Sequence, residues 1–290
     1  MNLQENKELL ELFKSTGELE SAESAVSREA FAAALKLPLN REIEKANLAR
    51  TLFATDKLAP GAQATYPVDI DPINAWVLPR IGAAPQNLVG VEEINVPLFE
   101  VTNSIEWKLQ LARQGRINIV QRKTLSLRNS IVKLENAAAW GLIRAAVSGS
   151  RTVNSSQTSL TKTAYNEGFQ MMTSMDDYKV DLVVVNAKRA GDIRDWGSNV
   201  LDPTTMREVW KQAGVGNIWG ADIIIENDLA DNELFLFDTS KMGAMPIRQD
   251  FVTYDDPTAI RTYRQRVLGY QEIGFVVFDA DAIVRVTLTV

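Results

Sequence analysis

The longest regular pattern in the sequence is an apolar repeat between residues 127 and 147. Ser126 can cap its start, and Ser148-Gly149-Ser150 marks its end. At 1.5 Å per residue, a helix of this length measures roughly 30 Å. We therefore expect one long beam helix to organise the fold. The repeat steps by three and four through Leu127, Ile131, Leu134, Ala138, Leu142 and Ala145.

The chain before this helix changes character near Tyr66. The first sixty residues look like three short, strongly charged helical pieces, which are marginal unless they pack on another surface. Five prolines then exclude a long helix. The stretch from Glu93 to Val101 alternates partly like a strand, although Pro97 fits only an edge or a bulge. The prolines are Pro67, Pro72, Pro79, Pro85 and Pro97.

A basic segment from Asn103 to Lys123 leads into the helix. It holds five basic residues and one acidic residue, Glu106. Turn signals at Asn103-Ser104 and Gln114-Gly115 predict a hairpin of about twenty residues. A hairpin of this size has no core of its own, so it needs another surface to cover it.

The C-terminal half has an α/β texture. After a Ser/Thr-rich stretch at 148–174, which we expect to be mostly loop, the pattern predicts a strand at 180–185 and helices at 187–196 and 202–213. Strands are expected at 222–225 and 233–237, and a two-stranded ribbon at 263–278 and 283–290.

Complementary charge suggests what the basic hairpin contacts. From Asp176 to Thr258 the chain has sixteen acidic and eight basic residues. Contact between neighbouring copies accounts for both the basic and the acidic segment. The alternative is that the cations around Trp107 bind nucleic acid. We favour contact between copies over this alternative.

Composition excludes several kinds of chemistry. The chain has no cysteine and no histidine, so the Ser-His-Asp and Cys-His arrangements and the usual zinc sites are absent. There is no phosphate-binding loop, and Glu92 and Glu93 are adjacent and point apart in an extended chain. We expect no catalytic, cofactor-binding or metal-binding residues. The formal charge of −6 argues against a strongly basic nucleic-acid binder, and the sequence shows neither an apolar run long enough for a membrane span nor a secretory signal.

The order of these segments resembles the major capsid proteins of tailed bacteriophages, which share the Hong Kong 97-type fold with encapsulin shells. The likeness runs from about Tyr66 to Val290. It implies an α+β fold with an N-terminal arm, an E-loop hairpin, a long spine helix with a peripheral β-sheet, and an axial α/β domain. The segments that carry the likeness are Trp76-Val77-Leu78-Pro79-Arg80, Val96-Pro97-Leu98-Phe99, Gly115-Arg116-Ile117-Asn118 and Gly269-Tyr270-Gln271-Glu272-Ile273-Gly274-Phe275.

The resemblance also implies a division of the chain. Residues 1–65 would form the helical arm, 66–94 an extended segment and 95–123 the E-loop. Residues 124–177 and 259–290 would form the peripheral domain, and 178–258 the axial domain. Within the E-loop, the residues expected to contact a neighbouring subunit are Trp107, Lys108, Arg113, Arg116 and Arg122.

The function that the resemblance implies is structural rather than enzymatic. Copies of the chain would assemble as pentamers and hexamers into an icosahedral virion capsid that encloses double-stranded DNA, in the host cytoplasm and without a cofactor or a membrane. Scaffold, portal and decoration proteins are possible further partners. The alternatives are an encapsulin-like shell around a protein cargo, a carboxylate-based carbohydrate-active enzyme and a monomeric binding module.

Overall fold

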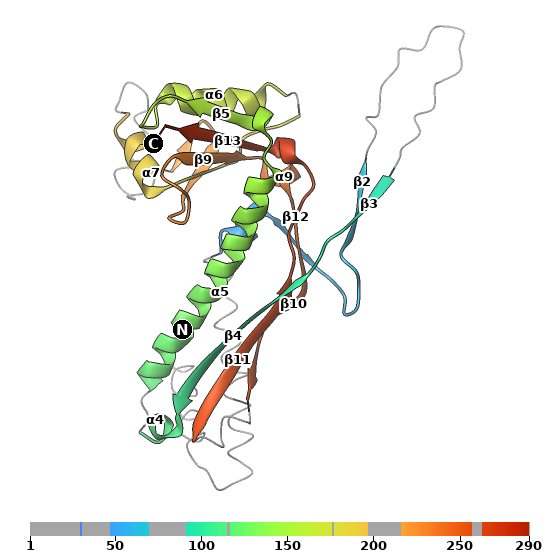
Figure 1. Ribbon diagram of the computed structural model, residues 1–290, viewed down its shortest axis with the longest axis vertical. Coiled ribbons are helices and arrows are strands. Elements are labelled where there is room, and N and C mark those ends of the chain that lie inside the picture. The colour runs from blue at the N-terminus through green and yellow to red at the C-terminus, as the bar shows by residue number, and fades with distance from the viewer. Residues whose placement is uncertain are drawn as a thin grey trace, which may run out of the picture.

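The computed structural model describes residue 30 and residues 47–69, 91–114, 117–175, 177–196, 216–256 and 263–289. The expected helix at 202–213 and most of the N-terminal arm lie outside the described residues. Two sheets, joined by one long helix, make up the body, and a narrow hairpin projects from it (Figure 1).

The long sheet has the strand order β1-β10-β11-β4, with β12 paired to one end of β10. Strand β4 pairs with β11 without interruption over ten residues, and β11 pairs with β10. The outer strand β1 is short and parallel to β10. The bounds are β1 Ala54–Lys57, β4 Phe99–Lys108, β10 Gly243–Asp255, β11 Arg264–Ile273 and β12 Val276–Val277.

Helix α5, Ile117–Ala146, is the expected beam, but it starts earlier than the apolar repeat indicated. Its 30 residues span about 45 Å. Its first half packs Leu127 and Ile131 into a core shared with the buried face of β4. Its second half carries Trp140, whose ring lies 5.2 Å from that of Phe235 in the other sheet. The helix therefore joins the two sheets through a single apolar core.

The second sheet has the order β5-β13-β9-β6-β8-β7. Helices α6 and α7 pack against one of its faces, while the other face shares the core of α5. The strands are β5 Thr152–Ser155, β6 Leu182–Val185, β7 Asn217–Ile218, β8 Ala221–Ile225, β9 Glu233–Phe237 and β13 Ile283–Leu288. The helices around this sheet are α6 Lys162–Thr173, α7 Ala187–Arg194, α9 Thr239–Met242 and the 3-10 turns η1 Gly149–Arg151 and η3 Ala280–Ala282.

Of the elements expected between residues 180 and 237, those that fall on described residues are confirmed as β6, α7, β8 and β9. Helix α6 was not expected in a stretch rich in Ser and Thr. Thr161 caps its start by accepting a hydrogen bond from the Ala164 backbone N–H, and it buries Tyr165 and Met172 against the sheet. The cap and the packing outweigh the weak local helix propensity.

The predicted hairpin at Asn103–Lys123 is wrong. Residues 99–108 form one straight strand, Leu109–Arg113 form the short helix α4, and α5 begins at Ile117. A turn does occur at Gln114, as predicted, but it lies between two helices rather than between two strands. Strand β4 takes its partner from β11, more than 150 residues later, and short-range turn signals carry no information about such a distant partner.

The predicted ribbon at the C-terminus is also wrong. Strand β11 joins the long sheet, whereas β13 lies inside the six-stranded sheet between β5 and β9. Conversely, β10 belongs to the long sheet although it was expected in the axial domain, and β5 and α6 pack with the six-stranded sheet. Alternation fixed which residues of β13 are buried, but it could not show which sheet buries them.

Two glycines provide a matched test of packing in the long sheet. A Cβ added at Gly269 would lie 2.6 Å from the ring of Phe251, which is fully buried. We expect Gly269→Ala to lower the free energy of unfolding by about 1–3 kcal/mol, because the core cannot accept the added methyl group. Gly141→Ala in α5, where a Cβ meets nothing within 4 Å, should instead raise it by up to about 1 kcal/mol. Chemical denaturation of both variants measures the difference, and equal effects would contradict this account of the core.

Candidate assembly interface

One hairpin is formed by β2, Thr65–Asp69, and β3, Val91–Asn95. The two strands pair antiparallel over five residues and project away from both sheets (Figure 1). A two-stranded ribbon does not bury enough apolar surface to be stable by itself. The described part of this hairpin therefore needs support at its base and leaves surface available for contact.

The base of the hairpin is fixed to the body by hydrogen bonds and by aromatic packing. The Val96 backbone N–H donates to the Ala64 carbonyl at 2.8 Å, which closes the hairpin. The Tyr66 hydroxyl donates to Asp56 at 2.8 Å, and its ring packs 5.2 Å from that of Phe278. Partial burial, together with this hydrogen bond, raises the pKa of Tyr66 above its ordinary range. These contacts hold the root of the hairpin and leave its strands extended.

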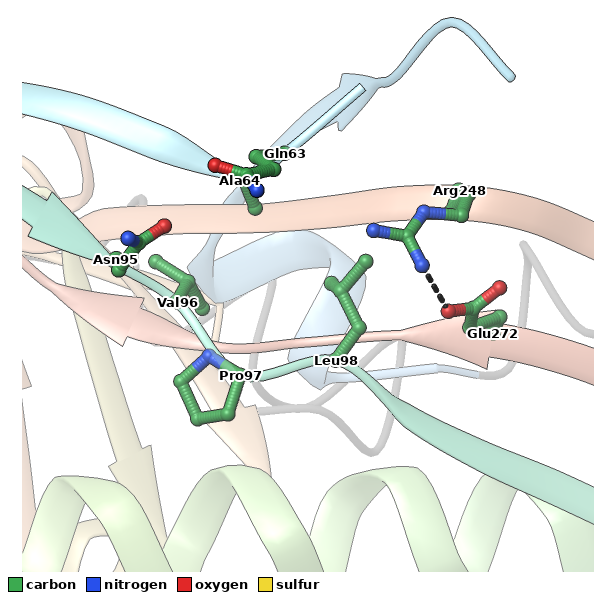
Figure 2. Close-up of a pocket in the computed structure, with 8 residues that line it drawn as sticks. All are labelled: Gln63, Ala64, Asn95, Val96, Pro97, Leu98, Arg248 and Glu272. Atoms are coloured by element: carbon green, nitrogen blue, oxygen red, sulfur yellow. Dashed lines mark hydrogen bonds and ion pairs between the residues drawn. The ribbon is translucent and has the colours of Figure 1, made fainter. Parts of the chain in front are cut away.

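An arginine of the long sheet also contacts the loop that precedes the hairpin. Arg248 of β10 contacts Glu272 of β11 at 2.6 Å (Figure 2). Arg248 also donates to the Ala62 carbonyl at 3.1 Å. The cleft around this pair has a volume of about 570 Å³. Arg248 therefore ties the loop before the hairpin to two strands of the sheet. The cleft is lined by Gln63, Ala64, Asn95, Val96, Pro97, Leu98, Arg248 and Glu272.

A second, more apolar cleft of about 380 Å³ lies between the hairpin root and the last turns of α5. Leu142 and Ala146 of the helix face Val96 and Phe278 across it. Phe278 is 37% exposed, so this apolar surface is only partly covered by the chain itself.

The charge of the projecting hairpin is opposite to the one expected for the E-loop. Strands β2 and β3 contain Asp69, Glu92 and Glu93 and no basic residue. The basic residues that were expected on a hairpin lie elsewhere. The sequence signal for the true hairpin was available in the proline-rich extended chain after Tyr66, but it contained no Asn-Gly or Asp-Gly turn to identify a hairpin.

The structure separates the five expected contact residues. Trp107 is 5% exposed and belongs to the core between β4 and α5, so its assignment as a contact residue is wrong. Its position in an alternating strand places it on the same buried face as Ile105. Lys108, at the end of β4, is exposed, and Arg122 is exposed on α5. Arg113 ends α4, and Arg116 lies outside the described residues.

Lys108 lies next to a cluster of ion pairs on the open face of the long sheet. Glu106 accepts hydrogen bonds from Arg264 and Arg266, at 2.5 and 2.8 Å, and Arg266 also contacts Asp256. These bonds hold the pKa of the Glu106 carboxyl below its usual value. A lowered pKa in the folded state means that the stabilisation is present at neutral pH and is lost as the pH falls through that pKa.

A buried polar network anchors the chain before the hairpin. Arg50 of α3, Ala49–Leu52, contacts Glu135 of α5 through two hydrogen bonds of 3.2 and 3.3 Å. Glu135 is fully buried and also accepts a hydrogen bond from Gln271 of β11. One carboxylate thus links the N-terminal segment, the beam helix and the long sheet.

The described residues offer little for metal or membrane chemistry. Within them, no three acidic side chains lie close enough together to hold a metal ion. None of the helices in this part of the chain is long and apolar enough to cross a membrane.

Comparison with known proteins places the chain in a family. Residues 100–286 match the family described as phage capsid protein. None of the curated proteins matches the sequence. The matched range contains α5 and most of both sheets and leaves the β2–β3 hairpin outside.

Solved structures share the fold at low sequence identity. A structure of Microbacterium phage Oxtober96 is 15% identical, covers 84% of this chain and 91% of that chain, and has a TM-score of 0.65. The capsid of cyanophage P-SCSP1u is 10% identical, with coverages of 82% and 86% and a TM-score of 0.64. A virus-like particle from Pyrococcus furiosus is 17% identical, with coverages of 87% and 97% and a TM-score of 0.58.

These matches confirm the Hong Kong 97-type fold expected from the sequence. The family match covers more than half of the chain and carries the functional assignment. The chain therefore belongs to the phage capsid protein family and is a structural subunit of a self-assembling virion shell.

Proposed function

We propose that copies of this chain form a closed icosahedral shell, built from pentamers and hexamers, that encloses double-stranded DNA. The observation that carries the proposal is the projecting β2–β3 hairpin, which contacts the body only at its root in the described structure. In a closed shell, each subunit makes several such contacts at once, so that modest contacts together stabilise the lattice. Assembly would take place in the host cytoplasm, and scaffold, portal and decoration proteins are candidate partners.

In this proposal the β2–β3 hairpin takes the part of the E-loop. The long sheet with α5 would be the peripheral domain, and the six-stranded sheet the axial domain. Head-to-tail contacts between copies would close into rings around the symmetry axes. The hairpin lies before the beam helix in the chain, as the E-loop does in the resemblance, and it is the described element that extends furthest from the body.

The acidic hairpin of one copy would contact the basic end of the next. The described part of this end contains Lys108 and Arg113, at the ends of β4 and α4, and Arg116 follows them in the sequence. Complementary charge steers such contacts and fixes their register. Of the expected residues, Lys108, Arg113 and Arg116 keep a role in contact between copies, but as the receiving surface rather than as the arm.

Charge reversal tests this contact. We expect Arg113→Glu with Arg116→Glu to leave the subunit folded and to reduce shell yield at least tenfold, because like charges would face each other. Glu92→Lys with Glu93→Lys should have the same effect. Combining all four changes restores attraction and should recover much of the yield, as measured by sedimentation and electron microscopy. Shells of normal yield from either double variant would contradict the contact, and so would four changes that fail to rescue assembly.

Negative-stain microscopy of the purified protein, with analysis of the particle contents, tests the proposal as a whole. Closed particles are expected, with DNA inside those made during infection. A protein cargo in place of DNA would identify the encapsulin-like alternative. A chain that stays at 32.2 kDa at every concentration would contradict the shell function.

A further inference from the structure

The first half of helix α5 has an unusual distribution of charge. Between Ile117 and Leu134 the helix has four basic residues and no acidic residue, in a chain whose net charge is −6. The next carboxylate, Glu135, is buried and is held by Arg50, so it does not neutralise the exposed face. The four basic residues are Arg122, Lys123, Arg128 and Lys133.

Helical geometry places two of these cations in one polar row. Arg122, Ser126, Asn129 and Lys133 follow one another at steps of four, three and four, which keeps them on one side of the helix. All four are exposed, and so is Lys123, which lies at the edge of the row, one turn before Leu127. The eleven steps from Arg122 to Lys133 correspond to about 16 Å of helix. We call these four residues, with Lys123 at their edge, the basic row.

The basic row faces away from the protein core. Leu127 and Ile131, which point to the long sheet, are fully buried, and Arg122, Ser126, Asn129 and Lys133 lie on the opposite side of the helix. Within the described part of the chain, Arg122, Lys123 and Lys133 take part in none of the ion pairs. The far side of the long sheet differs, because its charges are paired, as in Glu106 with Arg264 and Arg248 with Glu272.

The chemistry of the row fits a phosphate backbone. Phosphate oxygens are contacted in DNA complexes by Arg and Lys and by the side chains of Ser and Asn, which are the residue types found here. Duplex DNA carries one negative charge per about 1.7 Å of its length. Phosphates at this spacing are close enough together for every cation of the row to have one nearby. The exposed leucines Leu125 and Leu134 lie on the flanks of the row rather than in it, which disfavours an apolar partner for its centre.

We infer that the basic row binds the backbone of duplex DNA without sequence specificity, and that the α5 side of the subunit therefore faces the inside of the shell. This inference rests on the proposed shell function and adds the orientation of the subunit. It also gives Arg122 a role different from the contact between copies expected from the sequence.

The inference is tested with unassembled subunits and intact shells of the full-length chain. Binding of a fluorescent 30-base-pair duplex is measured by anisotropy across a series of salt concentrations. Each phosphate contact contributes about 0.9 to the slope of log K against log salt. Neutralising Arg122, Lys123 and Lys133 to Gln should lower that slope by about 2–3 and weaken binding roughly 100-fold at about 0.1 M salt. A matched control neutralises Lys162, Lys179 and Lys188, which are exposed around the six-stranded sheet, and should change neither value.

Binding to intact shells tests whether the α5 side of the subunit faces inward or outward. Shells of the wild-type chain should not bind the duplex from outside, although their subunits do before assembly. External binding that depends on Arg122, Lys123 and Lys133 would show that the row faces outward and would overturn the inference. So would equal binding by the row variant, the control and the wild type.

Two further outcomes also decide against the inference. DNA binding that appears only after residues 1–46 are deleted would assign the row to the N-terminal arm. A row variant that binds DNA normally but fails to assemble would assign it to contact between copies. A wild-type chain that never forms shells contradicts the proposed function itself. Normal shell formation, with DNA binding that does not depend on the basic row, contradicts only this inference.

Discussion

Replacing residues 65–95 by two glycines is expected to give a folded subunit that forms no closed shells. The Ala64 carbonyl and the Val96 N–H are hydrogen-bonded at 2.8 Å, so a short linker can close the gap without moving either end. The body loses the Tyr66 contacts with Asp56 and Phe278 at the root, but both sheets and α5 keep their partners. The arm that we propose to reach the neighbouring copy is then absent.

The measurement is particle yield by electron microscopy and sedimentation, with near-UV circular dichroism and thermal unfolding as the control for folding. Subunits without the hairpin should also lower the yield of wild-type subunits when the two are mixed, because they offer a receiving surface but no arm. Shells of normal yield from the shortened chain would remove the hairpin from the assembly mechanism.

Loss of Arg50 is expected to have the largest effect on the stability of the subunit. Arg50→Ala leaves Glu135 fully buried, with no cation in contact among the described residues. Removing one partner of a buried ion pair costs about 3–5 kcal/mol, because the remaining charge is uncompensated. The free energy of unfolding, measured by chemical denaturation of the unassembled subunit, should fall by that amount.

The chain provides a matched control in a second buried carboxylate. Glu233 is held by both Arg144, at 2.5 Å, and Arg285, at 2.8 Å. Arg144→Ala leaves the second cation in place, so its cost should be about 1 kcal/mol or less. If both substitutions cost the same, the special role of Arg50 is wrong. Arg50→Met with Glu135→Gln, which removes the charge and keeps a hydrogen-bonding partner for Gln271, should recover a large part of the loss.

Local patterns were sufficient for the elements whose burial is decided by their own residues. The four consecutive apolar residues of β6 are all buried, and the helix that follows begins at a capping Asn186. The apolar steps from Leu127 to Ala145 lie within α5. The first turns of α5 were missed because the turn signal at Gln114-Gly115 placed residues 117–123 in the predicted hairpin.

The candidate site was less accessible to sequence reasoning. The charge of Lys108 and Arg122 and their exposure were foreseen, but Trp107 was grouped with them because it is adjacent in the chain. In a strand, adjacent side chains point to opposite faces, so neighbours in sequence can be divided between the core and the surface. The Arg50–Glu135 pair joins residues 85 positions apart, and nothing in either local pattern indicates that they meet.

The sequence by itself determined the beam helix and the α/β character of the second half, because each depends on local periodicity, and the order of its segments resembled that of the capsid proteins. Only the tertiary structure decided which strands share a sheet, that β2 and β3 form a projecting acidic hairpin, and that Lys108 and Arg122 lie on the body. These features depend on pairings of β4 with β11 and of β13 with β5, which bring together residues more than a hundred positions apart, and on the pairing of β13 with β9, whose residues are 46 to 54 positions apart. Such pairings are selected by the packing of the whole chain, and the local hydrophobic pattern is compatible with several of them.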